Sequence, residues 1–383
     1  MPRCSVALLV NFVPPYRVAL LRALEREVRR LTVLVSTEME ADRPWQARSG
    51  GLDVRRIRSI TLPYRRGHPD GFSEDLTVHL SWDLLPRLAC LAPDVMISSE
   101  FGLRSLQAGL YRRLAALAGR RTRLLIWATV SEQTERGRGP LRSALRRLIA
   151  FMADGAVTNG TSGARYLETI GFPSGRIFAI HQSTDLDRFE NLPEPKPDPA
   201  GTLRLVSVGS LIPRKGLRPF LVRLKAWCAA HPERKLHWRL VGDGGERESL
   251  ESADLPANLE LELIGNRPYE AIPDLLVDRD LFVFPTLADE WGLVVNEAMA
   301  AGLPVLASRL SQAAEEMVRE GENGWLFDPL DPAATDAALA RALDAPPQER
   351  ASMAADARRT AARFSHGNTL RRMIGAIDAV WGR

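Results

Sequence analysis

Short apolar runs alternate with longer amphipathic stretches along most of this chain, and that alternation restricts its fold more than any other feature. In the first half, helical patterns such as residues 18–30 and 104–118 separate the candidate strands SVALLVNF, LTVLVS, DVMISS, RLLIWA and GAVTNG. The second half repeats the scheme with LRLVSVG, LHWRLVG, LELELIG, LFVFPT and LPVLAS. Because alternating strands and helices build parallel sheets that helices cover, the sequence predicts an α/β fold.

A proline-rich segment separates the two halves. Residues 191–201 (NLPEPKPDPAG) contain four prolines in eleven positions, and such a segment cannot continue a helix or a central strand. The full length of 383 residues suits two domains that each bury a core. We therefore predict two Rossmann-like domains, residues 1–190 and residues 202–366, that face a central cleft and are joined by a linker at residues 191–201.

Positive charge is concentrated in one part of the first half. The chain carries 51 Lys and Arg against 47 Asp and Glu, but residues 101–150 alone contain 11 Arg and 2 Glu. Such a region predicts an anionic membrane surface or a phosphate-bearing acceptor as partner, although a solvated arginine-rich surface explains it equally well. We do not expect nucleic acid as a partner, because no nucleic-acid module or stacking aromatic pattern accompanies the arginines.

A basic amphipathic helix is predicted within this region, over residues 139–153. Its arginines Arg142, Arg146 and Arg147 would share one face. The opposite face would be apolar and formed by Leu141, Leu145, Leu148, Ile149 and Met152. Such a helix suits either a membrane surface or a position against the core.

The cysteines and histidines predict neither a disulfide framework nor a metal site. The three cysteines are scattered without a C-x-x-C pair, and no two of the six histidines are spaced i, i+4. The apolar run before Asn11 predicts a first strand rather than a signal peptide, and no segment has the ~18 to 20 consecutive apolar residues of a membrane span. We expect a cytoplasmic protein, with peripheral attachment to the inner face of the membrane as the alternative.

The segment DEWGLVVNE, residues 289–297, is the most specific functional signal. It lies where the strand-like run LFVFPT gives way to a helix, and the first amides of a helix are unpaired and attract anions. The amides of Gly292, Leu293 and Val294 are therefore candidate phosphate donors. If the ligand is a sugar nucleotide, Asp289 could accept hydrogen bonds from the sugar hydroxyls, and Glu297 could accept a bidentate pair from the ribose diol.

Two cations enter a helix after the first strand of the second domain. In VGSLIPRKG, residues 208–216, Arg214 and Lys215 would lie where a diphosphate binds. The next strand ends in VGDGGE, residues 241–246. This is not a dinucleotide fingerprint, because Arg247 occupies the third glycine position of G-x-G-x-x-G. A third strand ends in LIGNRPY, residues 263–269.

Taken in order, these segments resemble the donor half of the retaining, GT-B-fold glycosyltransferases of family 4, also called glycosyl transferases group 1. Residues 289–297 are similar to the E-x7-E signature of that family, with Asp289 in place of the first glutamate. Residues 208–216 are similar to its V-G-R-L-x-x-x-K-G motif, with Ser210 in place of the arginine. Residues 241–246 resemble its V-G-D-G element, and Ile264 lies in the segment whose backbone reads the base in relatives.

The resemblance implies a set of donor-site residues and a C-terminal helix, about residues 367–383, that crosses back to the first domain. Lys215 and Arg214 are implied to stabilise a leaving diphosphate and Asp289 to orient the sugar, and these three are the expected catalytic residues. The implied donor-binding residues are Gly209, Ser210, Gly242, Asp243, Gly244, Ile264, Glu290, Trp291, Gly292, Leu293, Val294 and Glu297.

The acceptor half resembles the family only in outline. The turn NFVPPYR, residues 11–17, stands where many relatives carry a Gly-Gly loop. Tyr16 and Arg17 are expected either to meet an acceptor or donor phosphate, or merely to pack their helix. After the strand RLLIWA, where relatives frequently place a histidine near the reacting sugar, this chain has none, and Glu132 is the expected polar group.

The function that the resemblance implies is metal-independent transfer of a hexosyl unit from a nucleoside-diphosphate sugar to an acceptor hydroxyl, with retention of configuration. A UDP-sugar is favoured over a GDP-sugar as co-substrate, and no cofactor is expected. The expected acceptor is a glycan or a lipid-linked molecule, in cell-envelope, exopolysaccharide or glycolipid synthesis. The alternative is a catalytically weak pseudo-glycosyltransferase that binds a sugar nucleotide or a membrane.

Overall fold

The computed structural model describes residues 4–38, 50–190, 192–193 and 198–382, and within them the chain forms two compact units. The first unit comprises Met1–Pro69, Glu74–Gln182 and His366–Arg383. The second comprises Asp70–Ser73 and Ser183–Ser365, so it begins ahead of the predicted linker. Part of that linker, residues 191 and 194–197, lies outside the described residues.

A seven-stranded sheet forms the centre of the first unit, in the order β3-β2-β1-β6-β7-β8-β9. Each neighbouring pair in it is parallel. Its central strands are almost wholly buried, as expected for parallel strands covered on both faces. The strands are β1 (Ser5–Val10), β2 (Arg30–Val35), β3 (Val54–Arg56), β6 (Val95–Ser99), β7 (Arg123–Ala128), β8 (Gly155–Thr158) and β9 (Ile177–Ala179). A separate two-stranded sheet pairs β4 (Ser59–Gly67) with β5 (Ser73–Ser81).

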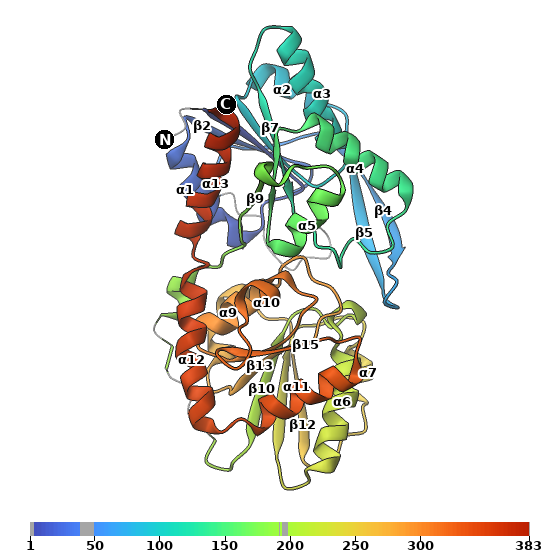
Figure 1. Cartoon of the computed structure of the whole chain (residues 1–383), viewed down its shortest axis with the longest axis vertical. Coiled ribbons are helices and arrows are strands. Elements are labelled where there is room, and N and C mark those ends of the chain that lie inside the picture. The colour runs from blue at the N-terminus through green and yellow to red at the C-terminus, as the bar shows by residue number, and fades with distance from the viewer. Residues whose placement is uncertain (1–3, 39–49, 191, 194–197, 383) are drawn as a thin grey trace. The chain divides into compact units, whose positions relative to one another are not determined.

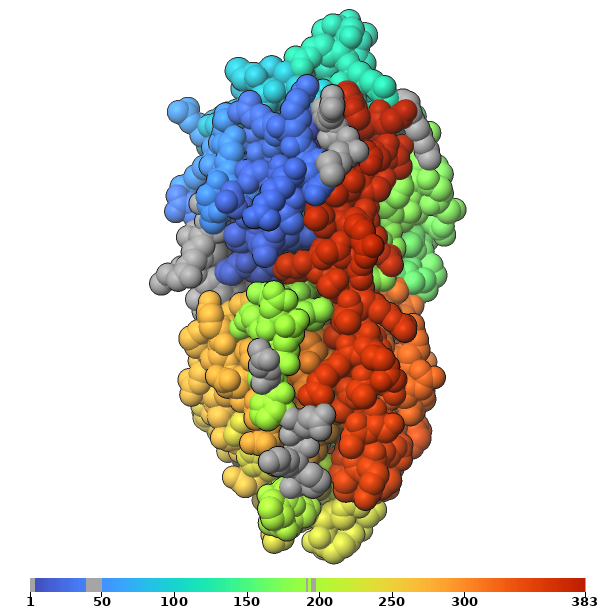
Figure 2. All heavy atoms as spheres, turned by 90° about the vertical axis from the view of Figure 1, so that its left-hand side faces the viewer, coloured from blue at the N-terminus to red at the C-terminus, as the bar shows by residue number. Residues whose placement is uncertain are grey.

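Helices from both ends of the chain cover one face of this sheet. α1 (Pro15–Glu27) and α13 (His366–Trp381) lie side by side in Figure 1, and Figure 2 shows the C-terminal segment against the N-terminal one. Met373 and Ile377 of α13 share a core cluster with Leu21 and Leu24 of α1. The other face is covered by α2 (Leu84–Leu91), α3 (Leu103–Leu117), α4 (Pro140–Met152) and α5 (Thr161–Thr169). The C-terminal helix therefore packs on the first unit, as predicted.

The second unit is built around a six-stranded parallel sheet, in the order β12-β11-β10-β13-β14-β15. The strands are β10 (Leu203–Val208), β11 (Leu236–Val241), β12 (Leu259–Gly265), β13 (Leu281–Phe284), β14 (Val305–Ser308) and β15 (Gly324–Phe327). One face packs against α6 (Leu217–Ala230), α7 (Arg247–Glu251) and α11 (Pro332–Asp344). The other packs against α8 (Ile272–Leu276), α9 (Leu293–Ala300), α10 (Gln312–Met317) and α12 (Pro347–Ala362).

The order of strands in the second unit decides where a ligand can bind. β10 and β13 are neighbours in the sheet, but the chain leaves β10 toward β11 on one side and β13 toward β14 on the other. At such a switch point the loops diverge and leave a crevice at the carboxyl ends of the strands. The loop after β10 carries Lys215, and the loop after β13 carries Asp289. The prediction of an α/β fold with Rossmann-like parallel sheets is confirmed.

The prediction for the faces of α4 is wrong in part. Ile149 is buried as expected, but Leu141 is 85% exposed and Leu148 is 49% exposed. Arg146, expected on the polar face, is only 2% exposed. The physical reason is a buried ion pair, which helical periodicity does not reveal. The Arg146 guanidinium lies 2.6 Å from a carboxylate oxygen of Glu135, which is itself buried.

Candidate functional site

Glycines bring the loops after β10 and β11 into backbone contact. The Gly209 amide donates to the Val241 carbonyl at 2.9 Å, and the Leu211 amide donates to the Asp243 carbonyl at 2.9 Å. Gly242 has φ +145°, and a Cβ at this position would lie 1.9 Å from the Gly209 carbonyl oxygen. Gly244 has φ +157°, and a Cβ there would lie 2.5 Å from the Leu211 carbonyl oxygen. The predicted glycines therefore shape the loop that carries the two cations.

Replacing Gly242 with alanine is expected to lower the free energy of unfolding by about 2 to 4 kcal/mol, because the new Cβ meets backbone and the residue keeps a left-handed φ. Gly245→Ala is the matched control, since no heavy atom lies within 4 Å of its Cβ position. Urea denaturation of both variants gives the comparison. Equal stability of the two variants would show that the loops can separate without cost.

Lys215 and Arg214 both lie beside Asp289. The Lys215 Nζ is 2.5 Å from Asp289 Oδ2, and the Arg214 Nη1 is 3.6 Å from the same oxygen. Arg214 also donates to the Ala288 carbonyl at 2.9 Å. 3₁₀ helix η3 (Pro213–Lys215) and the following Gly216, with φ +66°, position the two cations at the start of α6. The three predicted catalytic residues are therefore in contact.

Asp289 remains ionised in this arrangement. Burial pushes the pKa of its carboxyl upward, but Lys215, Arg214 and the Trp291 amide hold the pKa below its ordinary value. One carboxylate thus lies against two half-buried cations. A diphosphate at this point would meet the two cations, and Asp289 stays a hydrogen-bond acceptor.

The start of α9 depends on Gly292, whose φ is +99°. A Cβ there would lie 2.7 Å from the Phe284 ring and 3.0 Å from Ser311 Oγ. Within the described residues, no side chain caps this helix end. The amides of Leu293 and Val294 therefore lie at the open start of α9, at the position where the sequence predicts anion donors. The two predicted donor residues just before Gly292 differ in burial: Glu290 is exposed, whereas Trp291 is 1% exposed.

Trp291 has a structural position. Its Nε1 donates to Asn296 Oδ1 at 2.8 Å, and its ring lies 6.0 Å from that of Phe364. The indole is therefore part of the core beneath α9. Among the remaining predicted donor residues, Ser210 is exposed in the loop after β10, and Ile264 lies partly buried at the carboxyl end of β12.

Glu297 lies on α9 in a buried polar cluster and is 4% exposed. Thr184 Oγ1 donates to Glu297 Oε1 at 3.4 Å and lies 2.9 Å from the Tyr269 hydroxyl. The Arg188 guanidinium lies 4.0 Å from the centroid of the Tyr269 ring and donates to the Tyr269 carbonyl at 2.5 Å. Burial raises the pKa of Glu297 to about 7, against the lowering effects of Arg188, Tyr269 and Thr184. The Glu297 carboxyl group therefore lies in a buried cluster of hydrogen-bonding side chains.

Sequence reasoning missed the three residues around Glu297. Tyr269 ends the LIGNRPY segment, but that segment was valued only for its backbone. Thr184 and Arg188 precede the linker and belong to no motif. Burial raises the pKa of Tyr269 to about 12, with a contribution from Glu297, so its hydroxyl remains a proton donor.

The predicted acceptor-side residues lie in the first unit and make local contacts. The Arg17 guanidinium is 4.6 Å from the centroid of the Trp127 ring and 5.8 Å from that of Tyr16. Glu132 pairs with Arg165 at 2.6 Å. β1 and β6 are the neighbouring strands at the switch point of this sheet. The contacts of the predicted acceptor-side residues do not join the ends of these two strands.

Two polar residues that the sequence did not single out meet at that switch point. Asn11 Nδ2 donates to Glu100 Oε1 at 2.8 Å. Glu100 has φ +72°, which is uncommon outside glycine and is often kept at functional positions. Asn11 and Glu100 thus occupy the place in the first unit that Lys215 and Asp289 occupy in the second.

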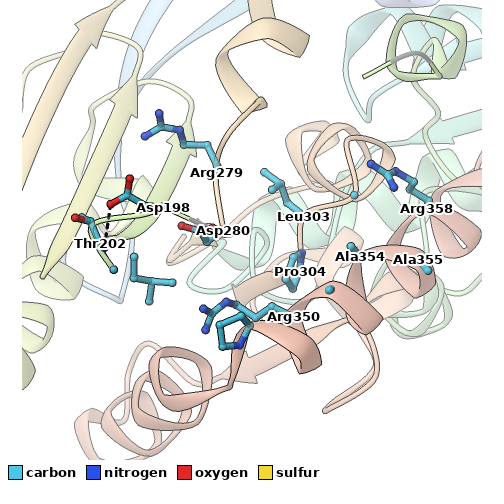
Figure 3. Close-up of a pocket in the computed structure, with 15 residues that line it drawn as sticks. Asp198, Thr202, Arg279, Asp280, Leu303, Pro304, Arg350, Ala354, Ala355 and Arg358 are labelled. Atoms are coloured by element: carbon cyan, nitrogen blue, oxygen red, sulfur yellow. Dashed lines mark hydrogen bonds between the residues drawn. The ribbon is translucent and has the colours of Figure 1, made fainter. Parts of the chain in front are cut away.

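One small cavity lies at this site, and a larger one lies elsewhere in the second unit. A narrow space of about 10 Å³ at the end of β10 is lined by Gly209, Ser210 and Lys215. A larger cavity of about 270 Å³ lies at the opposite, amino ends of β10, β13 and β14 (Figure 3). Its lining includes Arg350 and Asp280. We place the candidate site at the carboxyl ends, because parallel sheets commonly bind their ligands there and the predicted residues converge there.

Residues 188–360 match the family model of glycosyl transferases group 1. The D-inositol 3-phosphate glycosyltransferase of Thermobispora bispora is 32% identical over 243 residues, which are 59% of this chain and 56% of that protein. The amylovoran biosynthesis glycosyltransferase AmsK of Erwinia amylovora is 32% identical over 149 residues, which are 36% of this chain and 35% of that protein. The matches thus span little more than half of these relatives' length, or less.

Solved structures match over nearly the whole chain at low identity. The lipopolysaccharide outer core galactosyltransferase WaaB has a TM-score of 0.73 at 13% identity, covering 98% of this chain and 99% of that chain. Anabaena HepE in complex with UDP-glucose has a TM-score of 0.68 at 17% identity, covering 98% and 100%. Two parallel α/β units and this likeness define a GT-B fold, as predicted. Residues 188–360, somewhat less than half of the chain, are thus similar to the glycosyl transferases group 1 family.

Proposed function

We propose that this protein is a retaining glycosyltransferase that moves a hexosyl unit from a nucleoside-diphosphate sugar to an acceptor hydroxyl. One observation carries the proposal. Lys215, Arg214 and Asp289 converge where the loops after β10 and β13 diverge. Asp289 shortly precedes the start of α9, where no side chain caps the helix within the described residues. Two cations at the carboxyl end of a parallel sheet suit a diphosphate that gains charge as the sugar departs.

The chemistry assigned to this site is electrostatic. Lys215 and Arg214 stabilise the charge that develops on the leaving diphosphate, and Asp289 orients the sugar hydroxyls. The departing phosphate oxygen takes the proton of the acceptor hydroxyl as the new glycosidic bond forms on the same face, so no protein base is needed. Among the described residues, no three His, Cys, Asp or Glu side chains gather as metal ligands. Metal independence stays a prediction.

The donor and the acceptor are proposed by class. A UDP-sugar is favoured because a structure of the same fold, Anabaena HepE, is a complex with UDP-glucose. The names of the relatives, which act on D-inositol 3-phosphate or in amylovoran biosynthesis, support a phosphate-bearing or glycan acceptor in cell-envelope, exopolysaccharide or glycolipid synthesis. The anionic membrane remains a proposed partner, and no helix in the described ranges is long and apolar enough to cross a bilayer.

The proposal is tested with a panel of UDP-, GDP- and ADP-sugars. Donor binding is measured by calorimetry, and nucleotide release by mass spectrometry with mixed glycan and lipid-linked acceptors. We expect one nucleotide to bind and to be released, and product with the anomeric configuration of the donor by NMR. Donor binding without nucleotide release, whichever acceptor is present, would favour the pseudo-glycosyltransferase. The serine at position 210, where the family motif has an arginine, supports that alternative. Absence of both binding and release would overturn the proposal.

A further inference from the structure

Two helices of the first unit expose large apolar side chains together. α3 and α4 pack closely, since a Cβ on Gly109 of α3 would lie 2.9 Å from the Met152 side chain of α4. The Arg113 guanidinium of α3 lies 5.0 Å from the centroid of the Phe151 ring on α4. We name the exposed side chains Leu110, Leu114, Leu117, Leu141, Leu148 and Phe151 the α3–α4 apolar face. Single exposed leucines are ordinary, but a group on two joined helices indicates an interaction surface.

The exposure is extensive and periodic. Leu117 is 86% exposed, Leu141 is 85% exposed and Phe151 is 75% exposed. Leu110, Leu114 and Leu117 follow one another at i, i+4 and i+7, which places them on one stripe of α3. Leu141, Leu148 and Phe151 follow at i, i+7 and i+10 on α4. Both stripes face solvent in the described residues.

α4 exposes these side chains while it buries an arginine. Arg146 is held by Glu135 and lies over the rings of Phe101 and Tyr166, with 5.0 Å and 5.2 Å to their centroids. A helix that only covered a sheet would bury leucine and expose arginine, because burying a charged pair is costly. This orientation of α4, with leucines exposed and an arginine buried, is expected if the exposed leucines bind a partner.

The charged side chains on α3 and α4 are all arginines, and Asp154, just after α4, is paired with Arg112 of α3. Arg113, Arg120 and Arg147 are exposed on or beside the two helices. The two carboxylates of residues 101–150 are both engaged by arginines, Glu132 by Arg165 and Glu135 by Arg146. Exposed leucine and phenylalanine surrounded by arginine is complementary to an anionic lipid surface, where apolar groups enter the acyl boundary and guanidinium groups meet phosphates. A second copy of this chain would instead bring arginines against arginines.

We propose that the α3–α4 apolar face docks the protein reversibly on an anionic lipid bilayer, with Leu141, Leu148 and Phe151 entering the interface and Arg113 and Arg147 contacting headgroups. Burial of a leucine or phenylalanine side chain is worth about 1.5 to 3 kcal/mol, and each arginine near an anionic surface about 1 kcal/mol. Several such contacts suffice for reversible binding without a spanning segment. The inference does not rest on the proposed catalytic function.

Vesicle co-sedimentation of the full chain tests the proposal. The vesicles are phosphatidylcholine alone and an equimolar mixture with phosphatidylglycerol. We expect the protein to sediment with the anionic vesicles and much less with the neutral ones. The double variant Leu148→Glu with Phe151→Glu is expected to lower partitioning by at least about tenfold, because two apolar insertions are lost and charge repels charge. Arg147→Ala is expected to weaken binding to anionic vesicles only.

Val222→Glu is the matched control, since Val222 is 60% exposed on α6 of the second unit. It is expected to partition like the unaltered chain, and circular dichroism checks that each variant is folded. Equal loss of binding in the control and the double variant would overturn the proposal, as would failure of the unaltered chain to bind anionic vesicles. A dimer in solution that the double variant dissolves would assign the face to a second copy instead.

Discussion

Replacing Lys215 with alanine is expected to lower kcat for sugar transfer by about 10²- to 10³-fold, the loss typical of removing one group aimed at developing charge. The lysine Nζ lies at the switch point, 2.5 Å from Asp289, and is the compact cation of the site. Its contribution is greatest when the departing diphosphate carries most charge, so the loss should appear in kcat more than in donor affinity. Steady-state nucleotide release and donor calorimetry separate the two.

Two further variants sharpen this test. Lys235→Ala changes an exposed lysine just before β11, at the opposite end of the sheet, and is expected to leave kcat unchanged. Lys215→Arg keeps the charge but spreads it over a longer fork, and is expected to retain part of the activity. An unchanged kcat in Lys215→Ala, with the protein folded, would mean that the lysine serves only to neutralise Asp289.

The parts of the site that could be predicted from sequence are those that depend on local backbone. Gly242 and Gly292 are required because a Cβ would meet the Gly209 carbonyl or the Phe284 ring, and each glycine can be read directly from its short segment of sequence. The strands were predictable for a related reason: parallel strands covered on both faces become continuous apolar runs. Such features appear within one short segment as a glycine or an apolar run, even where the contact behind them, as between Gly242 and Gly209, joins two different loops.

The parts that could not be predicted depend on residues distant in sequence. Thr184, Tyr269 and Glu297 meet only because η4 (Tyr269–Ala271), α9 and the segment after β9 pack together. The burial of Arg146 likewise depends on Glu135, Phe101 and Tyr166, which come from different elements. A helical period reports which residues share a face, but not which face receives a partner.

Replacing Glu297 with glutamine is expected to stabilise the empty protein at high pH. The folded-state pKa of Glu297 is about 7, above its ordinary value of 4.5. Between these values the unfolded chain releases the proton while the folded chain keeps it, so the free energy of unfolding falls as pH rises. At one pKa unit per 1.36 kcal/mol, the loss is of the order of 3 kcal/mol by pH 8, and it is absent below pH 4.5.

The glutamine variant stays neutral, so its stability relative to the unaltered chain should rise between pH 5 and pH 8 by about that amount. Urea denaturation at both pH values measures the difference. Glu290→Gln, an exposed change in the same loop, is the control for the loss of a carboxylate as such. If Glu297→Gln behaves like this control, Glu297 is ionised in the empty protein and the buried cluster stabilises its charge.

Glu297→Gln should weaken donor binding although it stabilises the empty protein, and this difference separates a ligand role for Glu297 from a structural one. A carboxylate accepts two charge-assisted hydrogen bonds from a diol, each worth about 1.5 to 3 kcal/mol, whereas glutamine loses the charge. The variant is therefore expected to bind donor at least about tenfold more weakly at pH 8, although it is more stable. Because the empty site holds a proton near neutral pH and the bound site requires the carboxylate, the unaltered chain should release a proton on binding donor at pH 6. Calorimetry in buffers of different ionisation enthalpy measures that proton, and its absence in the unaltered chain would remove Glu297 from the donor site.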